Sequence, residues 1–323
     1  MEARWLGKPY YSLDAFCKNT YGEKYYKIAL DAGFSCPNRD GTLSTGGCIF
    51  CSAGGSGDFA VRTDASSVKA QLLSGRRLFK EKNTGNRFIA YFQAYTNTYG
   101  PVSYLREIYT AALSLPDVAG ISIATRCDCL GKDILALLAE LKSTYADKFI
   151  WVELGLQTIH EATLRFLNSG FTLADFEQAM TTLATLNIPV IVHVILGLPG
   201  ETHVDMYATC TYLNRQKPFG IKLQLLHILK DTPLGEMYLS DTLPDFSVLS
   251  LEEYTDIVIH CLEILSPDIT IHRLTGDGPK DLLIAPLFSL NKRNVLNTLH
   301  KTMRERGTYQ GRCFYDAGSI DSL

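Results

Sequence analysis

The sequence predicts an α/β fold: an open, partial (β/α)6 barrel over residues 25–245, preceded by an N-terminal segment, 1–24, and followed by an α+β extension, 246–323. Three observations carry this prediction. Short apolar runs alternate with longer segments of helical periodicity. The strand runs are apolar almost throughout, as in parallel sheets that are covered on both faces. Beyond about residue 245 this alternation stops.

The elements follow one another in a regular order. Strands are predicted over 25–30, 88–92, 118–124, 149–156, 190–196 and 221–228. Helices are predicted over 67–80, from 101 past 113, over 132–141, between 161 and 186, and over 204–214. Pro101 suits a helix start, where its missing N–H costs nothing. In the extension we expect a helix, a short strand over 269–272, a Gly/Pro turn and a last helix over 292–306. Six units fall short of the usual barrel, so we expect the barrel to be open.

Composition excludes several classes of protein. The 323 residues include 31 Lys and Arg against 34 Asp and Glu, a net charge of −3, which excludes a polycationic tail protein. The start of the chain lacks the apolar core of a signal peptide, and no apolar run approaches the ~20 residues of a membrane span. We therefore expect a cytoplasmic protein without a membrane partner. The nine cysteines then indicate metal or redox chemistry rather than disulfides.

The strongest motif lies in the loop after the first strand. Eleven residues separate Cys36 from Cys48, and two separate Cys48 from Cys51. Zinc usually takes a fourth protein ligand, and iron–sulfur clusters normally take four thiolates, but no fourth Cys or His lies nearby. Three thiolates would leave one iron of a 4Fe–4S cluster open to a reactant. A zinc loop or reduced core thiols are the alternatives.

This loop, with Phe50 before its last cysteine and a barrel of six units, resembles the radical S-adenosylmethionine (radical SAM) superfamily. The long first spacing is similar to the branch that contains the Elongator catalytic subunit. The resemblance implies a partial TIM-like barrel and two cofactors, a 4Fe–4S cluster and S-adenosylmethionine (SAM). It assigns Cys36, Cys48 and Cys51 to the cluster.

The resemblance also implies a SAM site at the carboxyl ends of the strands, where barrel enzymes place their chemistry. Segment 92–98 corresponds to the turn that holds the methionine amino group, although its usual Gly-rich form is absent. Segment 153–158 is similar to SAM-contacting residues of coproporphyrinogen-oxidase-like enzymes, and segment 193–201 to the strand along the adenine. We expect the methionyl end near Gln93, Gln157 and Ser169, the ribose near Glu153, and Phe50 beside the adenine.

Two departures from the family pattern stand out. Relatives carry an arginine for the methionine carboxylate where this chain has Ser169, and the loss removes a bidentate partner. Either another cation replaces it, with Arg126 a candidate, or SAM binds more weakly. After the third strand the family usually reads Thr-Arg-Pro-Asp-Cys, whereas this chain has Cys127 in place of the proline. Cys127 is either a functional thiol or a small buried apolar residue.

A narrower resemblance covers nearly the whole chain. Segments 29–41, 56–60, 91–98, 272–279 and 306–311 are similar to a family of bacterial radical SAM proteins. The branch it most resembles is implicated in converting the carboxymethylaminomethyl group of the tRNA wobble uridine to an aminomethyl group. The implied partners are the tRNA anticodon loop and an electron donor such as flavodoxin or ferredoxin. Hydrogen removal beside the carboxylate, loss of a second electron and hydrolysis would release glyoxylate. The candidate cations for that carboxylate are Lys230, Arg273 and Arg126.

Other substrates stay open at this point. A radical SAM enzyme acting on a small molecule such as a porphyrin precursor is the main alternative, and a non-catalytic RNA-binding module is a third. Lys301, Arg304 and Arg306 cluster at the end of the last helix, where they either grip phosphates or complement the helix dipole. Tyr309 and Phe314 nearby are candidates for stacking on a base.

Overall fold

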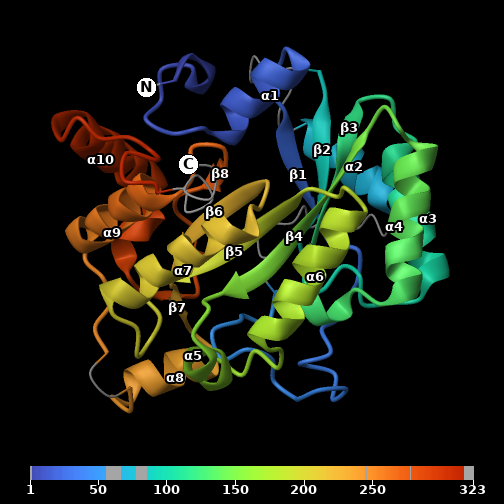
Figure 1. Ribbon diagram of the computed structural model, residues 1–323. Coiled ribbons are helices and arrows are strands. Elements are labelled where there is room, and N and C mark those ends of the chain that lie inside the picture. The colour runs from blue at the N-terminus through green and yellow to red at the C-terminus, as the bar shows by residue number, and fades with distance from the viewer. Residues whose placement is uncertain (1, 56–66, 78–85, 244–245, 277, 316–323) are drawn as a thin grey trace, which may run out of the picture.

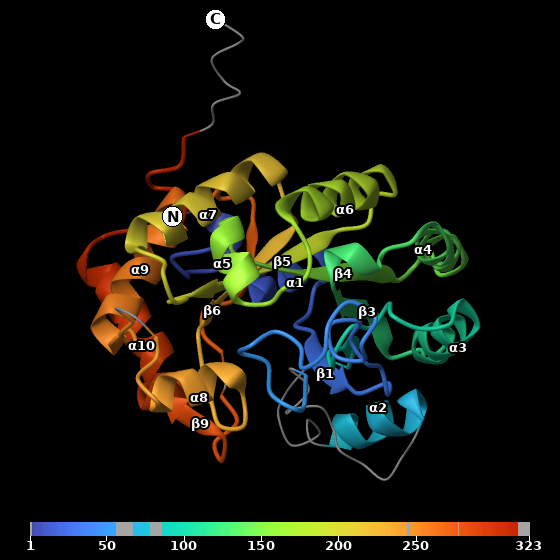
Figure 2. The same ribbon diagram turned by 90° about the horizontal axis from the view of Figure 1, so that it is seen from below.

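A parallel sheet of seven strands forms the centre of the molecule (Figure 1). The computed structural model describes residues 2–55, 67–77, 86–243, 246–276 and 278–315. In sheet order the strands are β1 (Tyr26–Leu30), β2 (Phe88–Phe92), β3 (Val118–Thr125), β4 (Phe149–Gln157), β5 (Val190–Leu196), β6 (Gly220–Leu225) and β8 (Thr270–Arg273). The sheet curls into an arc with its carboxyl ends at one mouth, which Figure 2 views end-on. The predicted partial barrel is confirmed.

Helices cover the outer, convex face of this arc (Figures 1 and 2). They are α2 (Val68–Arg77), α3 (Val102–Leu113), α4 (Lys132–Thr144), α6 (Leu173–Thr185), α7 (His203–Gln216) and α9 (Leu251–Ile264), while the short α5 (Glu161–Phe166) lies at the mouth (Figures 1 and 2). Capping boxes at Thr172, Thr202 and Ser250 begin α6, α7 and α9, where each hydroxyl satisfies a backbone N–H. Of the helices in the described ranges, none combines the length and the apolar character needed to cross a membrane.

The C-terminal part departs from the prediction in two ways. The short strand expected in the extension is β8, and it pairs with β6 as the seventh strand of the barrel sheet. The strand expected over 221–228 is divided: β6 ends at Leu225, and β7 (Ile228–Leu229) pairs antiparallel with β9 (Leu283–Ala285). The other α-helices of the described ranges are α1 (Leu13–Tyr21), α8 (Pro233–Leu239) and α10 (Lys292–Glu305). Of these helices, only α10 was predicted. Helices α1 and α8 are short, and α1 precedes the first strand of the parallel sheet. The division at residues 24 and 245 stays a prediction.

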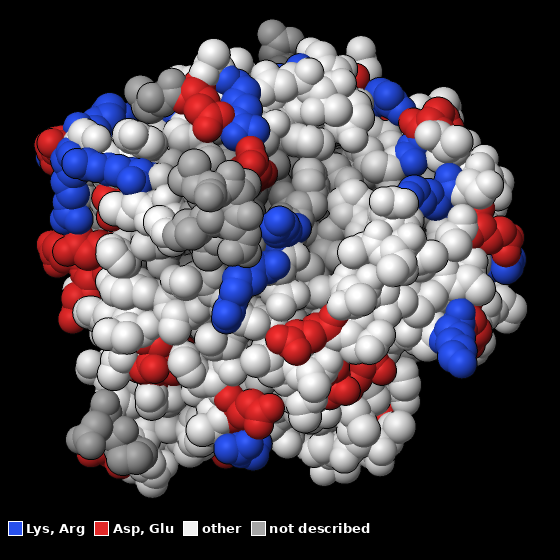
Figure 3. Space-filling model, in the orientation of Figure 1, with Lys and Arg blue, Asp and Glu red and all other residues white. Residues whose placement is uncertain are grey.

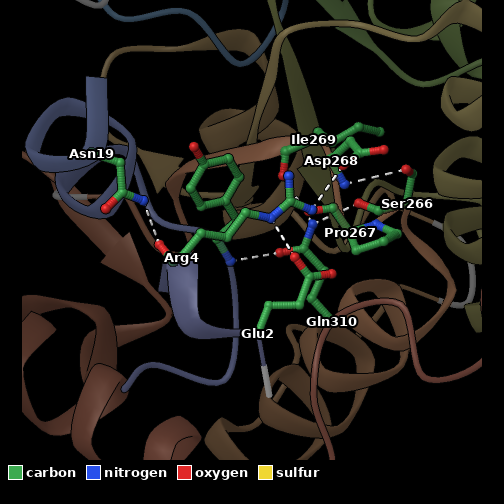
Figure 4. A network of polar contacts seen from close by, with 9 residues as sticks. Glu2, Arg4, Asn19, Ser266, Pro267, Asp268, Ile269 and Gln310 are labelled. Atoms are coloured by element: carbon green, nitrogen blue, oxygen red, sulfur yellow. Dashed lines mark hydrogen bonds and ion pairs between the residues drawn. The ribbon is translucent and has the colours of Figure 1, made fainter. Parts of the chain in front are cut away.

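The two ends of the described chain meet at the β8 edge of the sheet. Ser12 forms a parallel bridge with Ile271, and Ile271 N–H donates to the Tyr11 carbonyl. The buried Gln310 side chain accepts from Tyr11 N–H and donates to the carbonyls of residues 266 and 269 (Figure 4). Arg4 reaches the same turn and pairs with Asp268 at 2.7 Å. The N-terminal segment and the C-terminal residues thus close this edge together.

Candidate functional site

The loop after β1 carries Cys36, Cys48 and Cys51 across the mouth of the barrel (Figure 2). Arg39 ties its two parts together, because Nη2 donates to the carbonyl of Cys51 at 2.8 Å and to the next carbonyl at 2.6 Å. Gly47 runs against this guanidinium with a φ of +82°, and a Cβ there would lie 2.8 Å from Arg39 Nε. The loop therefore has a fixed path, which leaves all three thiols half-buried.

One cavity, with about 830 Å³ of empty space, opens beside these thiols. Strands β2, β3 and β4 end at it, since the carboxyl ends of parallel strands share one edge of a sheet. The predicted residues that line it are Cys36, Cys48, Phe50, Cys51, Gln93, Arg126, Glu153, Gln157 and Ser169. All the residues that the motifs assigned to the cluster and to SAM are thus brought together. We name this space the cysteine cavity.

Two polar atoms in its wall are buried without a hydrogen-bond partner among the described residues. They are Oε1 of Gln157 and Oγ of Ser169. Gln157 has a φ of +67° at an irregularity in the β4–β5 pairing, a conformation that L-residues adopt rarely. Buried polar groups are normally hydrogen-bonded, so these two atoms suit a polar ligand. With three thiols beside them, the donor set fits a 4Fe–4S cluster and the polar methionyl end of SAM.

Arg126 lines the same cavity and contacts the backbone of Ser169. Its Nη1 donates to the Ser169 carbonyl at 2.8 Å, and Nε and Nη2 form a bidentate pair with Asp128. The guanidinium also lies over the Phe171 ring, 5.4 Å from its centroid. Burial opposes the charge, but the Asp128 hydrogen bonds outweigh it and raise the pKa of Arg126. The side chain is therefore a permanent cation in the wall of the cysteine cavity.

Glu153 lines the same cavity, but both of its oxygens are already engaged. Oε1 accepts from Lys27 and Ser122, and Oε2 accepts from Lys222 and from His193 at 2.7 Å. Burial alone would raise the pKa of this carboxyl, but the ammoniums of Lys222 and Lys27 hold it well below its usual range. Glu153 is thus the centre of a buried polar network, which we name the floor network, and not an open ligand for the expected ribose.

The floor network was not anticipated from the sequence, apart from Glu153. Lys222 is 4% exposed and donates to Tyr91 Oη at 3.1 Å as well as to Glu153. Burial and the Lys27 charge lower its pKa to about 7, against the attraction of Glu153. Burial and the Lys222 charge likewise lower the pKa of His193 to about 4, so this imidazole is neutral near pH 7. The sequence feature that could have indicated this network is a lysine inside an otherwise apolar strand, which occurs at Lys27 and at Lys222.

A second cavity, with about 900 Å³ of empty space, adjoins the first. The residues common to both walls are Phe50, Cys51, Tyr91, Gln93 and His193. Arg273, at the end of β8, lines the second cavity and is half-buried. Within the described ranges its guanidinium has no hydrogen bond or ion pair. We name this space the β8 cavity, and it meets the cysteine cavity beside Cys51.

The third candidate cation lies elsewhere. Lys230 is exposed, and its Nζ donates to the Asp281 carbonyl at 3.2 Å. It lines neither the cysteine cavity nor the β8 cavity. Of the two remaining candidates, Arg126 belongs to the cysteine cavity and Arg273 to the β8 cavity.

The other singled-out cysteines lie outside the loop. They are Cys127 and Cys129. Because β3 ends at Thr125 and residues 127–129 form a short 3-10 helix, these two side chains do not follow the alternation of a strand. Cys127 is buried in the main hydrophobic core, 5% exposed, as a small apolar residue is. Cys129 is half-buried. The motif segment 56–60 and Asp277 lie outside the described residues.

The basic cluster at the end of α10 is largely paired. Lys301 lies 3.8 Å from Glu305, and Arg306 lies 2.6 Å from Asp256. Figure 3 shows Lys and Arg side chains interspersed with Asp and Glu on this side of the molecule. In Figure 1, α10 lies at the end with α1, away from the mouth that α5 and α8 flank. Tyr309 packs beside Trp5, at 6.3 Å between ring centroids.

Comparison with known proteins agrees with this geometry. The profile of the Radical SAM superfamily matches residues 41–213, and that of the Radical_SAM C-terminal domain matches 218–305. The chain is 44% identical to the uncharacterized protein YtqA of Bacillus subtilis (strain 168), over 95% of this chain and 93% of that protein. It is 25% identical to a tRNA uridine(34) acetyltransferase of Methanocaldococcus jannaschii, over 58% of this chain and 33% of that protein.

Among solved structures, the archaeal Elp3 of Methanocaldococcus infernus shares the fold. Its TM-score is 0.66 at 14% sequence identity, and the match covers 88% of this chain and 64% of that one. With the superfamily profile matched over more than half of the chain and a relative matched over nearly its whole length, the chain belongs to the radical SAM superfamily, whose members use a 4Fe–4S cluster and SAM.

Proposed function

We propose that this radical SAM enzyme converts the carboxymethylaminomethyl group of the tRNA wobble uridine to an aminomethyl group, in the cytoplasm. One observation carries the proposal. The cysteine cavity and the β8 cavity meet at Phe50, Cys51 and Tyr91, and the β8 cavity holds the guanidinium of Arg273, which pairs with no carboxylate among the described residues. A reactive species formed beside the cysteines thus reaches a compartment suited to an anionic substrate.

Cys36, Cys48 and Cys51 are proposed to hold the 4Fe–4S cluster. When bound, the cluster and SAM supply a 5′-deoxyadenosyl radical, which removes a hydrogen atom from the substrate. Gln93, Gln157 and Ser169 would receive the methionyl end of SAM, and Arg126 would face its carboxylate. Phe50 would pack beside the adenine. The engaged oxygens of Glu153 assign it to the floor network rather than to the ribose.

The substrate side chain would enter the β8 cavity with its carboxylate toward Arg273. The methylene between nitrogen and carboxylate is the expected site of hydrogen removal, because both neighbours stabilise a radical there. Loss of one electron to a one-electron acceptor, such as an iron–sulfur or flavin protein, and of one proton gives an imine. Water then releases glyoxylate and leaves the aminomethyl group. The chain's task is to position the methylene and to exclude competing water.

The choice of tRNA as the substrate rests on a relative and on the accessibility of the wobble base. A protein that shares part of this sequence is a tRNA uridine(34) acetyltransferase. A wobble base is already unpaired in its loop, so little energy is needed to bring it into a cavity. The α10 basic cluster is not required for this proposal.

The test uses protein with its cluster reconstituted, SAM, a strong reductant and tRNA that carries carboxymethylaminomethyl uridine. Nucleoside mass spectrometry should show aminomethyl uridine, glyoxylate and 5′-deoxyadenosine formed together. The Cys51→Ala variant should form none of them, and Cys313→Ala, which changes an exposed thiol, should form all three. Deoxyadenosine without aminomethyl uridine would show that the radical forms but the substrate is another molecule.

A further inference from the structure

The floor of the two cavities is a polar layer to which every strand of the sheet contributes. From β1 to β8 the contributors are Lys27, Tyr91, Ser122, Glu153, His193, Lys222 and Arg273. Within the layer, Lys222 is the register partner of His193 on one side and of Arg273 on the other. Neighbouring strands lie about 4.8 Å apart, so Lys222 and Arg273 are adjacent residues of one ladder.

This layer carries an excess of positive charge. Glu153 is the sole carboxylate among the described residues that line either cavity, and it is shared between Lys27 and Lys222. His193 contributes no charge near pH 7, because its pKa is lowered to about 4. Arg273 remains without a carboxylate partner in the described part of the chain. A cation in a low-dielectric wall is costly unless a counter-ion approaches it.

Lys222 has a further N–H for such a counter-ion. Its ammonium donates to Glu153 and to Tyr91 Oη, and these contacts leave one N–H of the group unused. The side chain lines the β8 cavity, as does Arg273. Glu153 and Tyr91 fix the position of Nζ, so little side-chain entropy is lost when an anion binds.

We propose that Lys222 and Arg273 form one carboxylate-binding subsite in the β8 cavity, and that it selects substrates by their carboxylate. Glu153 and Tyr91 are positioning residues for Lys222. The inference rests on the proposed function for the identity of the substrate, but the subsite follows from the charges and contacts of the floor network.

The test compares two anticodon stem–loops that differ by one carboxylate. One carries carboxymethylaminomethyl uridine at the wobble position, and the other carries methylaminomethyl uridine. Dissociation constants are measured by fluorescence anisotropy with cluster-reconstituted protein, and S-adenosylhomocysteine replaces SAM so that nothing turns over. Charge-assisted hydrogen bonds should make the carboxylate RNA bind about 10- to 100-fold more tightly.

Lys222→Met and Arg273→Gln should each reduce this ratio toward one, because the carboxylate RNA then loses a partner that the carboxylate-free RNA does not have. Lys18→Met, which removes an exposed ammonium on α1, should leave the ratio unchanged. In Lys222→Met, Glu153 keeps its hydrogen bonds from Lys27, Ser122 and His193. If that variant does not fold, the ratio measured for Arg273→Gln tests the subsite. A ratio that persists in the folded variants overturns the subsite.

A soak separates failure of the subsite from failure of the proposed function. Crystals of the full chain are soaked with N-methylglycine, and a carboxylate should appear between Lys222 Nζ and the Arg273 guanidinium. If the wild-type protein binds neither RNA, the tRNA assignment fails and the soak decides the subsite. A soaked crystal with no carboxylate at these two cations then overturns it.

Discussion

The guanidinium of Arg126 donates to the carbonyl oxygen of Ser169 over 2.8 Å, from the end of β3 to the loop after α5. Ser169 stands where the family resemblance implies an arginine. Arg126 therefore brings a guanidinium to this point, and Asp128 holds it in place. We propose it as the partner of the methionine carboxylate.

Arg126→Gln should weaken SAM binding by about 10- to 100-fold, because a charge-assisted contact to the methionine carboxylate is lost. Isothermal titration of cluster-reconstituted protein with SAM measures this. Arg165→Gln changes an exposed arginine on α5 and should bind SAM as the wild type does. An unchanged affinity in Arg126→Gln would assign the carboxylate to another residue.

Cluster content should depend on Cys36, Cys48 and Cys51 and on no thiol beyond the loop. Each of these three residues changed to Ala should lose the brown colour and the iron and sulfide content together. Cys127→Ala and Cys129→Ala should retain them. If either of the latter lost the cluster while one of the three proved dispensable, the ligand assignment would be wrong.

Gln310→Ala should destabilise the fold by about 2–4 kcal/mol, because three buried backbone groups lose their partner. Urea unfolding followed by circular dichroism measures the change. Gln178→Ala, on the exposed face of α6, removes one surface hydrogen bond and should cost far less. Equal effects of the two substitutions would contradict the proposed closure of the β8 edge.

His193 should make the fold sensitive to acid. Its pKa is lowered from 6.5 to about 4, so between these values the unfolded chain binds more protons than the folded one. Stability should therefore fall as the pH drops through this window, by up to about 3 kcal/mol from this group. His193→Gln should lose less stability than the wild type between pH 6.5 and 4 in urea titrations of cluster-free protein. If the free energy of unfolding fell equally with pH in the wild type and in His193→Gln, the imidazole of His193 would not be the cause of the acid sensitivity.

The preference for the carboxylate RNA should weaken as the pH rises above about 7. In the protein without substrate, the Lys222 ammonium has a pKa of about 7 and loses its proton in this range. The charged or titratable groups that face it are Glu153, Lys27, Tyr91, His193 and Arg273. Between pH 6 and 9 Glu153 stays ionised, because its pKa is held well below its usual range, and Tyr91 and His193 stay neutral, because the pKa of Tyr91 is raised and that of His193 is lowered to about 4. The anisotropy ratio measured across this range should fall for the wild type and stay flat for Lys222→Met. A flat wild-type profile would contradict a titrating Lys222.

Much of the fold and of the cysteine cavity was predictable. Apolar runs identify the parallel strands, and β5 agrees with the prediction over Val190–Leu196. The family resemblance groups Gln93, Gln157 and Ser169, the first two at strand ends, and the structure gathers all three in one cavity. The strands follow from local pattern and the strand-end positions from connection order, whereas the grouping of the three site residues follows from motifs shared with the family.

The floor network was not predictable in the same way. Lys222 and Arg273 become neighbours only because β8, a short strand after a long connection, returns to pair with β6. The contact of Lys222 with the carboxyl of Glu153, three strands of the sheet away from β8, depends on the curl of the sheet. A lysine in an apolar strand indicates a buried polar contact, but the sequence does not show which residue makes that contact.

The closure of the β8 edge has a consequence for biosynthesis. The bridge from Ser12 to Ile271 and the hydrogen bond from Tyr11 to Gln310 join segments 259 and 299 positions apart. Residues 11 and 12 leave the ribosome well before residues 271 and 310, with which they pair. The edge can therefore be sealed only after residue 310 has been made, although β8 and its Arg273 have emerged before that step.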